Sequence, residues 1–326
     1  MEEVLYHPKF GYYTSSRNPI GREGDFYTSS DLDPVFGKLL AQKFAAMAST
    51  LGVPAEEFNI LELGAGRGLL ARQILQHQRF PYFILERSAA MRERQSRNLE
   101  GYSVEWLDDL LVGFTGCIFS NEFFDALPVH RVVRRGGVLR EIYVTEEFTE
   151  IEGPLQQSME LPLAEGQLAD VSPDSMVWIQ RVAESLERGY HLAIDYGYQD
   201  REFYARPRGT LMCYWKHQAV EDPYLRIGEQ DMTAHVNFSD LMRAGTAAGL
   251  ETEEFRTQMD FLIRLGVLSE VETLAHTRSV DALNRLSAIK RLILPDGMGE
   301  RYKVLIQQKA VSPEGAMLGG AGLPGT

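Results

Sequence analysis

The sequence predicts an α/β fold in which helices cover a mostly parallel β-sheet. Short apolar runs alternate with stretches whose apolar residues recur at helical spacing, which is typical of βαβ units. A glycine-rich turn follows the first apolar run, as in folds that bind a nucleotide-like ligand at the carboxyl edge of the sheet. These observations predict a Rossmann-like architecture.

The first half of the chain supplies the regular part of this fold. Apolar residues at helical spacing predict a helix over 33–51, ahead of the first strand. The other elements expected in this half are strands over 58–63, 81–86, 103–107 and 116–124 and helices over 69–78 and 89–99.

The second half of the chain is less regular. Residues 129–150 predict an antiparallel hairpin whose turn lies at Gly136–Gly137, and residues 199–235 predict mixed loop. The remaining elements are helices over 174–186, 237–250 (capped by Asn237 or Ser239) and 270–294, a strand over 189–198 and a last, antiparallel strand over 301–310.

Composition and charge limit the classes of function. The 326 residues carry a formal net charge of −13, which disfavours a nucleic-acid partner because phosphates are repelled, and favours a cationic one. No segment reaches the roughly 20 apolar residues of a membrane span, and the N-terminus lacks the pattern of a secretion signal. We therefore expect a cytoplasmic protein without nucleic-acid or membrane partners; a homodimer is left open.

The two cysteines, Cys117 and Cys213, form no CxxC pair. Neither a zinc site nor a disulfide framework is indicated. We expect chemistry without a metal.

The glycine turn reads ELGAGRG from Glu62 to Gly68. A dinucleotide fingerprint, GxGxxG, would need glycine at position 69, which is leucine. An acid followed by GxGxG instead resembles the first motif of class I methyltransferases, which implies S-adenosylmethionine as the cofactor. The residues then expected to bind it are Glu62, Gly64, Ala65, Gly66 and Gly68. The alternative is a turn that serves packing alone.

Acids after the next two strands extend this site. Glu86 ends the second strand, where nucleotide-binding folds place a carboxylate that binds the ribose hydroxyls, and Arg87 follows it. Asp108 and Asp109 follow the third strand and could reach the adenine amine. Solvated acids at strand ends are the alternative.

The fourth strand ends in a polar and aromatic sequence, Asn121-Glu122-Phe123-Phe124-Asp125. Because the carboxyl ends of parallel strands face the ligand crevice, an Asn-Glu pair at this point is well placed for chemistry. The aromatic residues that follow could shape a pocket for a methyl acceptor.

With further segments, this stretch resembles the MidA-type methyltransferases. The shared motifs are LYHPKFGYY, GDFYTSSDLDPVFG, ILELGAGRGLL, NEFFDALPVHRV, AIDYGY, GTLMCYWKH, DMTAHVNFSDL and PDGMGERYKVL. That family includes a mitochondrial enzyme that methylates an arginine of a complex I subunit.

The resemblance implies a class I methyltransferase fold: a seven-stranded, mostly parallel sheet with an antiparallel last strand, an N-terminal lid and an inserted subdomain. It implies a lid loop with Gly24, Asp25 and Phe26 over the cofactor. It further implies an acceptor side with Phe123, Asp195 and Tyr196.

One methyltransferase domain is expected over residues 1–310. Its expected parts are a lid and helix over 1–55, a core over about 56–128 and 176–310, insertions over about 129–175 and 199–240, and a disordered tail over 311–326.

An arginine acceptor would need a carboxylate, because guanidinium is always protonated and is a poor nucleophile. Glu122 is the first candidate to bind it and take its proton, with Asp125 and Asn121 beside it. Methylation of a small molecule on oxygen or nitrogen is the alternative acceptor chemistry. An NAD-dependent oxidoreductase and a cofactor-binding assembly scaffold without turnover are the competing classes.

Overall fold

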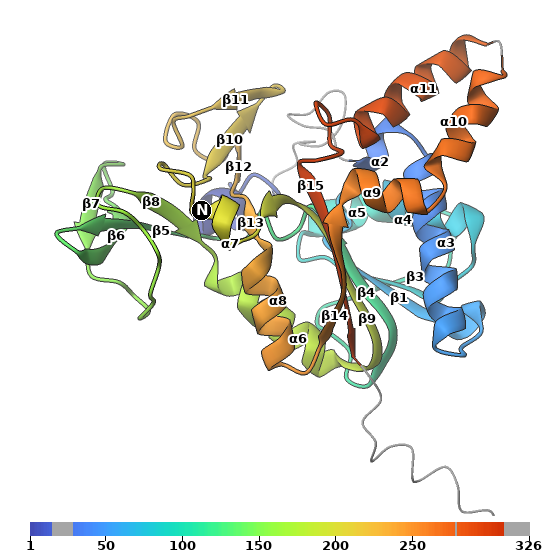
Figure 1. The fold of residues 1–326 in the computed structure, drawn as a ribbon, viewed down its shortest axis with the longest axis horizontal. Coiled ribbons are helices and arrows are strands. Elements are labelled where there is room, and N and C mark those ends of the chain that lie inside the picture. Colours follow the sequence, from blue (N-terminus) through green and yellow to red (C-terminus); the bar gives the residue numbers. More distant parts are fainter. Residues whose placement is uncertain (15–28, 278, 310–326) are drawn as a thin grey trace, which may run out of the picture.

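The computed structural model describes residues 1–14, 29–277 and 279–309. They form a central sheet with helices on both faces, and two small antiparallel sheets project beyond it (Figure 1). The lid residues Gly24, Asp25 and Phe26 and the tail over 311–326 lie outside the described residues.

The central sheet has the order β14-β15-β9-β4-β1-β2-β3. Neighbours from β3 to β9 are parallel, whereas β15 is antiparallel to both β9 and β14. The predicted mostly parallel, seven-stranded sheet is confirmed, and a short strand, β13, adds to β9. The strands are β1 (Asn59–Leu63), β2 (Tyr82–Leu85), β3 (Val104–Leu107), β4 (Phe114–Asn121), β9 (Leu186–Tyr198), β13 (Val236–Asn237), β14 (Glu251–Thr257) and β15 (Tyr302–Lys309).

Helices bury both faces of this sheet. On one face Phe44 of α3 meets Phe119 of β4, with ring centroids 5.1 Å apart; on the other, Ile179 and Val182 of α6 enter a second core with Phe238 of α8. The helices are α3 (Val35–Thr50), α4 (Leu69–His77), α5 (Ala89–Asn98), α6 (Pro173–Ser185), α8 (Phe238–Ala247), α9 (Gln258–Arg264), α10 (Val267–Ala275) and α11 (Val280–Ile293).

The C-terminal third differs from the sequence prediction in two places. Strand β14 was not expected, because its sequence ETEEFRT has no apolar run; it is an edge strand bonded only to β15 and does not need one. The single helix expected over 270–294 is two helices, because Ser279 starts α11 by accepting a hydrogen bond from the Ala282 N–H at 3.1 Å. The cap of α8 is Asn237, whose Oδ1 accepts from the Ser239 N–H at 3.1 Å.

Two small sheets extend from the core (Figure 1). The predicted hairpin is confirmed, with Gly136 and Gly137 at φ of 58° and 77°, and it belongs to a four-stranded antiparallel sheet. The segment expected as mixed loop holds a three-stranded sheet, whose strands are too short for a visible alternation. The bounds are β5 (His130–Arg135), β6 (Val138–Val144), β7 (Glu150–Gly153), β8 (Leu168–Val171), α7 (Asp200–Phe203), β10 (Met212–Trp215), β11 (Gln218–Val220) and β12 (Asp231–Thr233).

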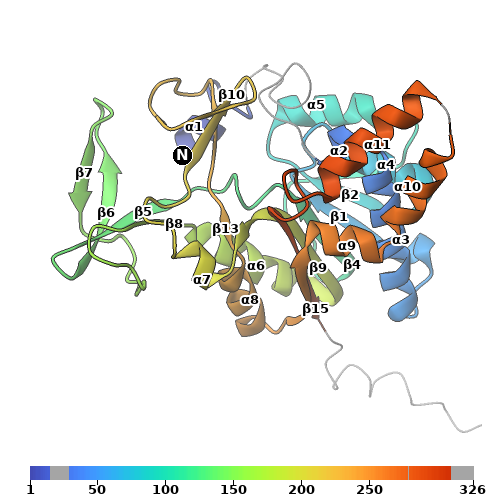
Figure 2. The same cartoon turned by 45° about the horizontal axis from the view of Figure 1, so that its top comes forward.

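The N-terminal segment packs on the three-stranded sheet (Figure 2). Its helix α1 (Glu2–Tyr6) places Leu5 with Tyr12, Cys213 and Met232 in a separate apolar cluster. A short helix, α2 (Ser29–Leu32), lies instead against α4 and α11. The start of the chain and residues 212–233 thus form one wall beside the central sheet.

No helix among the described residues has the length and apolar character needed to cross a membrane.

Candidate active site

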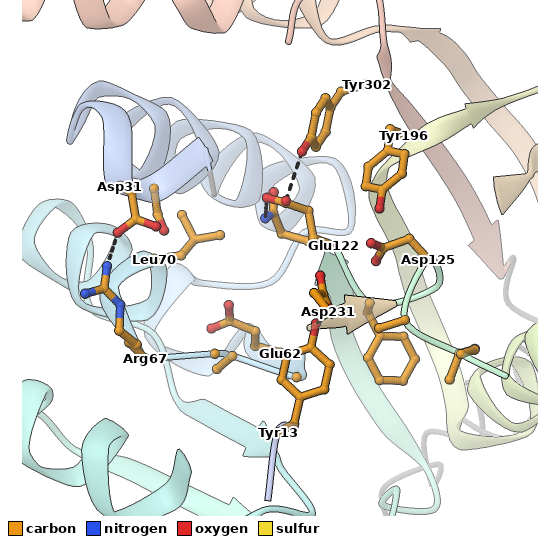
Figure 3. Close-up of a pocket in the computed structure, with 18 of the residues that line it drawn as sticks. Tyr13, Asp31, Glu62, Arg67, Leu70, Glu122, Asp125, Tyr196, Asp231 and Tyr302 are labelled. Atoms are coloured by element: carbon orange, nitrogen blue, oxygen red, sulfur yellow. Dashed lines mark hydrogen bonds and ion pairs between the residues drawn. The ribbon is translucent and has the colours of Figure 1, made fainter. Parts of the chain in front are cut away.

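A cavity of about 1740 Å³ opens at the carboxyl edge of β1, β2, β4 and β9 (Figure 3). Its lining comes from the turns after these strands and from the wall made by the N-terminal segment and β10–β12. Ligand pockets commonly measure about 300–1,000 Å³. The cavity can therefore hold a cofactor together with an acceptor group.

The glycine turn forms one side of the cavity. Gly64, Gly66 and Gly68 have φ values of 64°, 51° and 75°, a region that favours glycine. A Cβ on Gly64 would lie 3.0 Å from the ring of Phe123, so glycine is required for this ring to rest on the turn. Ala65 lines the cavity with Gly64 and Gly66, whereas Gly68 begins α4.

A charged contact joins this turn to the N-terminal segment. Arg67, between the last two glycines, forms an ion pair with Asp31 of α2 (Figure 3). The side chain of Asp31 thus reaches the glycine turn.

Two buried carboxyls follow the first and second strands. Glu62 accepts a hydrogen bond from the Tyr82 hydroxyl at 2.7 Å, and burial raises its pKa to about 7. Glu86 accepts from the Ser88 N–H at 2.9 Å and from Gln95 Nε2 at 3.0 Å. Burial also raises the pKa of Glu86. Both acids line the cavity in fixed orientations.

Of the neighbouring charged residues, Arg87 and Asp108 reach the cavity and Asp109 does not. Arg87 lines it, with its guanidinium 4.4 Å from the ring centre of Tyr6. Asp108 also lines it and pairs with Arg92 at 2.7 Å. Asp109 is exposed, does not line the cavity and pairs with Arg181. The expectation for Asp109 is thus corrected, because the chain turns away directly after Asp108.

These groups fit S-adenosylmethionine. The turn lets a ligand approach the backbone closely, and both acids expected to accept from the ribose hydroxyls and the adenine amine, Glu86 and Asp108, line the cavity beside it. Among the described residues, no group of three His, Cys, Asp or Glu side chains could hold a metal ion.

Glu122 stands at the end of β4 in a strained conformation. Its φ is 56°, unusual for a residue other than glycine, and its N–H donates to the Ile194 carbonyl at 2.9 Å. The carboxyl accepts from the Tyr302 hydroxyl at 2.9 Å and from Asn121 Nδ2 at 3.0 Å. Burial first, and then the field of Asp125, raise its pKa to about 8.

Asp125 is the second acid of this side. Burial raises its pKa to about 6, and the nearby Tyr196 hydroxyl limits the rise. Its Oδ1 is buried and has no hydrogen-bond partner among the described residues; the same holds for Oδ1 of Asn121. Both unpaired oxygens belong to side chains that line the cavity.

Asp195 plays a different part from the one expected. It is fully buried and does not line the cavity. Its Oδ2 accepts from the backbone N–H groups of Phe123, Phe124 and Asp125 at 3.2, 2.9 and 3.3 Å. Burial and the nearby acids raise its pKa. Asp195 therefore holds the turn that carries the acids, while Phe123 and Tyr196 do line the cavity.

Sequence reasoning missed three further residues of this side. Tyr302 begins β15, and because that strand is antiparallel, its first residue reaches the carboxyl edge opposite Tyr196. Asp231 begins β12, is 3% exposed and accepts from the Tyr13 hydroxyl at 2.8 Å. The antiparallel direction predicted for the last strand could have indicated that Tyr302 lies at the site. For Asp231 and Tyr13, the only indication in the sequence was their place in shared motifs.

Comparison with known proteins identifies the relatives of this chain. The model of a family described as "Putative S-adenosyl-L-methionine-dependent methyltransferase" matches residues 39–256, more than half of the chain. A protein of Drosophila melanogaster named protein arginine methyltransferase NDUFAF7 homolog, mitochondrial, is 27% identical over 94% of this chain and 79% of its own length. The human protein of that name is also 27% identical, over 93% of this chain and 77% of its own.

A solved structure agrees with these sequence relatives. A Burkholderia thailandensis protein bound to S-adenosyl-homocysteine is 30% identical and superposes with a TM-score of 0.85, covering 95% of this chain and 87% of that one. The expected MidA-type resemblance, fold and S-adenosylmethionine cofactor are confirmed.

The comparisons contradict the prediction of a cytoplasmic protein, because the curated relatives are named as mitochondrial. Net charge and the lack of a long apolar segment are features that cytoplasmic and mitochondrial proteins share. They do not separate the two compartments.

Proposed function

Because this chain belongs to the family of S-adenosyl-L-methionine-dependent methyltransferases, we propose that its acceptor is an arginine side chain of a protein. The observation that carries the proposal is the pair of acids at the end of β4, Glu122 and Asp125, which face the same cavity as the glycine turn. The names of the curated relatives support it, and so does the net charge of −13.

The two acids would compensate for the low nucleophilicity of an arginine acceptor. Guanidinium is a poor nucleophile while it is protonated, and its planar donors match a carboxylate. Glu122 and Asp125 would bind it, orient one nitrogen and draw positive charge away from that nitrogen. At a pKa of about 8, Glu122 keeps its proton near neutral pH while the cavity is empty. The positive charge of a bound guanidinium would lower this pKa, and the ionised Glu122 would then be able to take up the proton that methyl transfer releases.

S-adenosylmethionine, when bound, supplies an electrophilic methyl group and leaves as S-adenosylhomocysteine. A new carbon–nitrogen bond forms on the acceptor, and the proton lost from that nitrogen passes to Glu122. Tyr302 and Asn121 hold this carboxyl by hydrogen bonds. Phe123, which packs edge-on against Trp178 with ring centroids 5.2 Å apart, helps to exclude water.

The test is transfer of labelled methyl groups. The purified protein is incubated with methyl-labelled S-adenosylmethionine and extract of its source cells, and labelled proteins are hydrolysed to amino acids. We expect label in methylarginine. Label confined to small molecules would overturn the arginine proposal and indicate metabolite methylation, while label in methyllysine would indicate a different side chain.

A substitution tests the role of Glu122. Glu122→Gln keeps the size of the side chain but cannot take the proton, so turnover should fall roughly 10²–10⁴-fold with little change in S-adenosylhomocysteine affinity. Glu146→Gln, the same change at an exposed site on the four-stranded sheet, serves as the control. Equal turnover in both variants would remove Glu122 from the reaction.

A further inference from the structure

We propose that Asp231, on the three-stranded sheet, forms with Asp125 the subsite that binds the guanidinium group of the acceptor. This inference rests on the proposed function and names the residues that would select its substrate. The segment over 199–240 would then determine which acceptor is methylated, while the central sheet holds the cofactor.

The two acids come from distant parts of the chain and face the same part of the cavity. Asp125 follows β4 and Asp231 begins β12, and both line the cavity. The Ala234 N–H donates to the Asp125 carbonyl at 3.0 Å, which fastens the end of β12 to the turn after β4. In Figure 3 both carboxylates border the space below Glu122.

Asp125 has an unmet hydrogen-bonding capacity there. Asp125 as a residue is only 5% exposed, and its Oδ1 has no partner among the described residues. A buried acceptor without a donor is unfavourable, and a ligand with several N–H donors would satisfy it.

The local field favours a cation. Burial is the first cause of the raised pKa of three surrounding tyrosines, Tyr6, Tyr13 and Tyr214, and the two carboxylates raise it further. Arg301 also lines the cavity and opposes this effect at Tyr214, but less strongly than either acid. The negative charge of the two acids therefore dominates the field at Tyr214.

The tyrosines give this subsite a shape that suits a flat cation. Tyr13 and Tyr196 line the cavity, and Tyr196 meets Tyr302 with ring centroids 5.6 Å apart. Aromatic faces bind a guanidinium plane, whose forked donors also match carboxylates better than the compact ammonium of lysine does. The geometry thus points to arginine rather than lysine.

Tyr13 connects the subsite to the cofactor. Its hydroxyl donates to Asp231 Oδ1 at 2.8 Å, and its carbonyl accepts from Ser88 Oγ at 2.8 Å. The N–H of Ser88 in turn donates to Glu86 at 2.9 Å. One chain of contacts therefore runs from the expected ribose-binding acid to Asp231.

Direct titration of a small guanidinium compound tests the subsite apart from methyl transfer. N-acetyl-arginine amide is titrated calorimetrically into the full-length protein in the presence of S-adenosylhomocysteine. We expect binding by the unchanged protein and at least about tenfold weaker binding by Asp231→Asn and by Asp125→Asn, since each variant loses a hydrogen bond to a charged partner. Asp222→Asn, at an exposed position of the same segment, should bind like the unchanged protein.

Three results would overturn the proposal: no binding of the arginine compound at tens of millimolar, equal binding by Asp231→Asn, or equal binding of N-acetyl-lysine amide by the unchanged protein. The comparison with the lysine compound uses only the unchanged protein, so it tests the proposal even if Asp231→Asn fails to fold. The melting temperature and the S-adenosylhomocysteine affinity of each variant show whether it is folded. Arginine binding through Asp231 without methylarginine would refute the proposed function alone. Methylarginine formation with arginine binding unaffected by Asp231→Asn would refute the subsite alone.

Discussion

The two halves of the cavity are built in different ways. The cofactor side, residues 62–68 and 86–88, comes from two neighbouring strand ends. The acceptor side, comprising Tyr13, Glu122, Asp125, Asp231 and Tyr302, comes from separate segments that span most of the chain. The residues expected to bind the cofactor thus come from a short stretch of sequence, whereas those proposed to bind the acceptor come from segments across the whole fold.

The two halves also differ in how far along the chain the hydrogen-bond donors to their acids lie. Glu86 receives its hydrogen bonds from Ser88 and Gln95, which lie within nine residues of it. Glu122 receives one from Tyr302, 180 residues away. We therefore expect changes on the cofactor side to affect ligand binding locally, and changes on the acceptor side to affect both activity and the free energy of unfolding.

The largest effect on stability is expected at Asp195. Asp195→Ala would leave buried N–H groups of Phe123, Phe124 and Asp125 without their acceptor, at about 1–3 kcal/mol for each unsatisfied group. We expect the free energy of unfolding in urea to fall by at least about 3 kcal/mol, with loss of methyl transfer. Asp195→Asn retains an acceptor oxygen and should lower the free energy of unfolding by less. An equal loss of unfolding free energy in both variants would show that the hydrogen bonds to this turn do not account for the stabilising effect of Asp195.

A large effect on the cofactor side is expected at Gly64. Gly64→Val forces a branched residue to adopt a φ of 64° and brings its side chain against Phe123. Strain of about 1–3 kcal/mol should weaken S-adenosylhomocysteine binding by up to about a hundredfold in calorimetry. Gly52→Val, at a similar φ of 66° but with open space around it, supplies the control. Comparable loss of affinity in both would mean that backbone strain acts through global folding rather than at the turn.

A smaller effect should distinguish the acids after β2 and β3. Glu86→Gln removes the charge expected to bind the ribose hydroxyls and should weaken S-adenosylhomocysteine binding about tenfold. Asp109→Asn should leave it unchanged, because Asp109 is exposed and does not line the cavity. If Asp109→Asn weakened S-adenosylhomocysteine binding more than Glu86→Gln did, Asp109 and not Glu86 would be the acid that contacts the cofactor.

The last effect concerns the pH dependence of the melting temperature. The pKa of Glu122 rises from 4.5 to about 8 on folding, so the folded protein keeps a proton that the unfolded chain releases above about pH 4.5. The stability linked to this proton is complete below pH 4.5 and is lost as the pH rises to about 8. Glu122→Gln lacks this titration. Its melting temperature relative to the unchanged protein should therefore increase by at least about 2 °C between pH 5 and 8; a constant difference would contradict the raised pKa.

Much of the core could be predicted because its signals are local. The glycine turn, Glu86 and the Asn121–Asp125 segment each adjoin a buried strand, and parallel strands bring such segments to one edge. The alternation of apolar runs and helices was sufficient for the sheet from β3 to β9. Strand β14 was not predicted because an edge strand needs no apolar run. The break at Ser279 was not predicted because it separates two stretches that each have apolar residues at helical spacing, and the sequence prediction joined them.

By itself, the sequence determined the fold class, the cofactor turn and the acids at the end of β4. Only the tertiary structure decided that Asp195 supports the turn instead of facing the cavity, that Asp109 lies outside it, and that Tyr302 and Asp231 belong to it. The physical reason is that a strand end places a neighbouring side chain through backbone geometry alone. Contacts between distant segments depend instead on how the N-terminal segment and β10–β12 pack beside the sheet, and no local pattern encodes that packing.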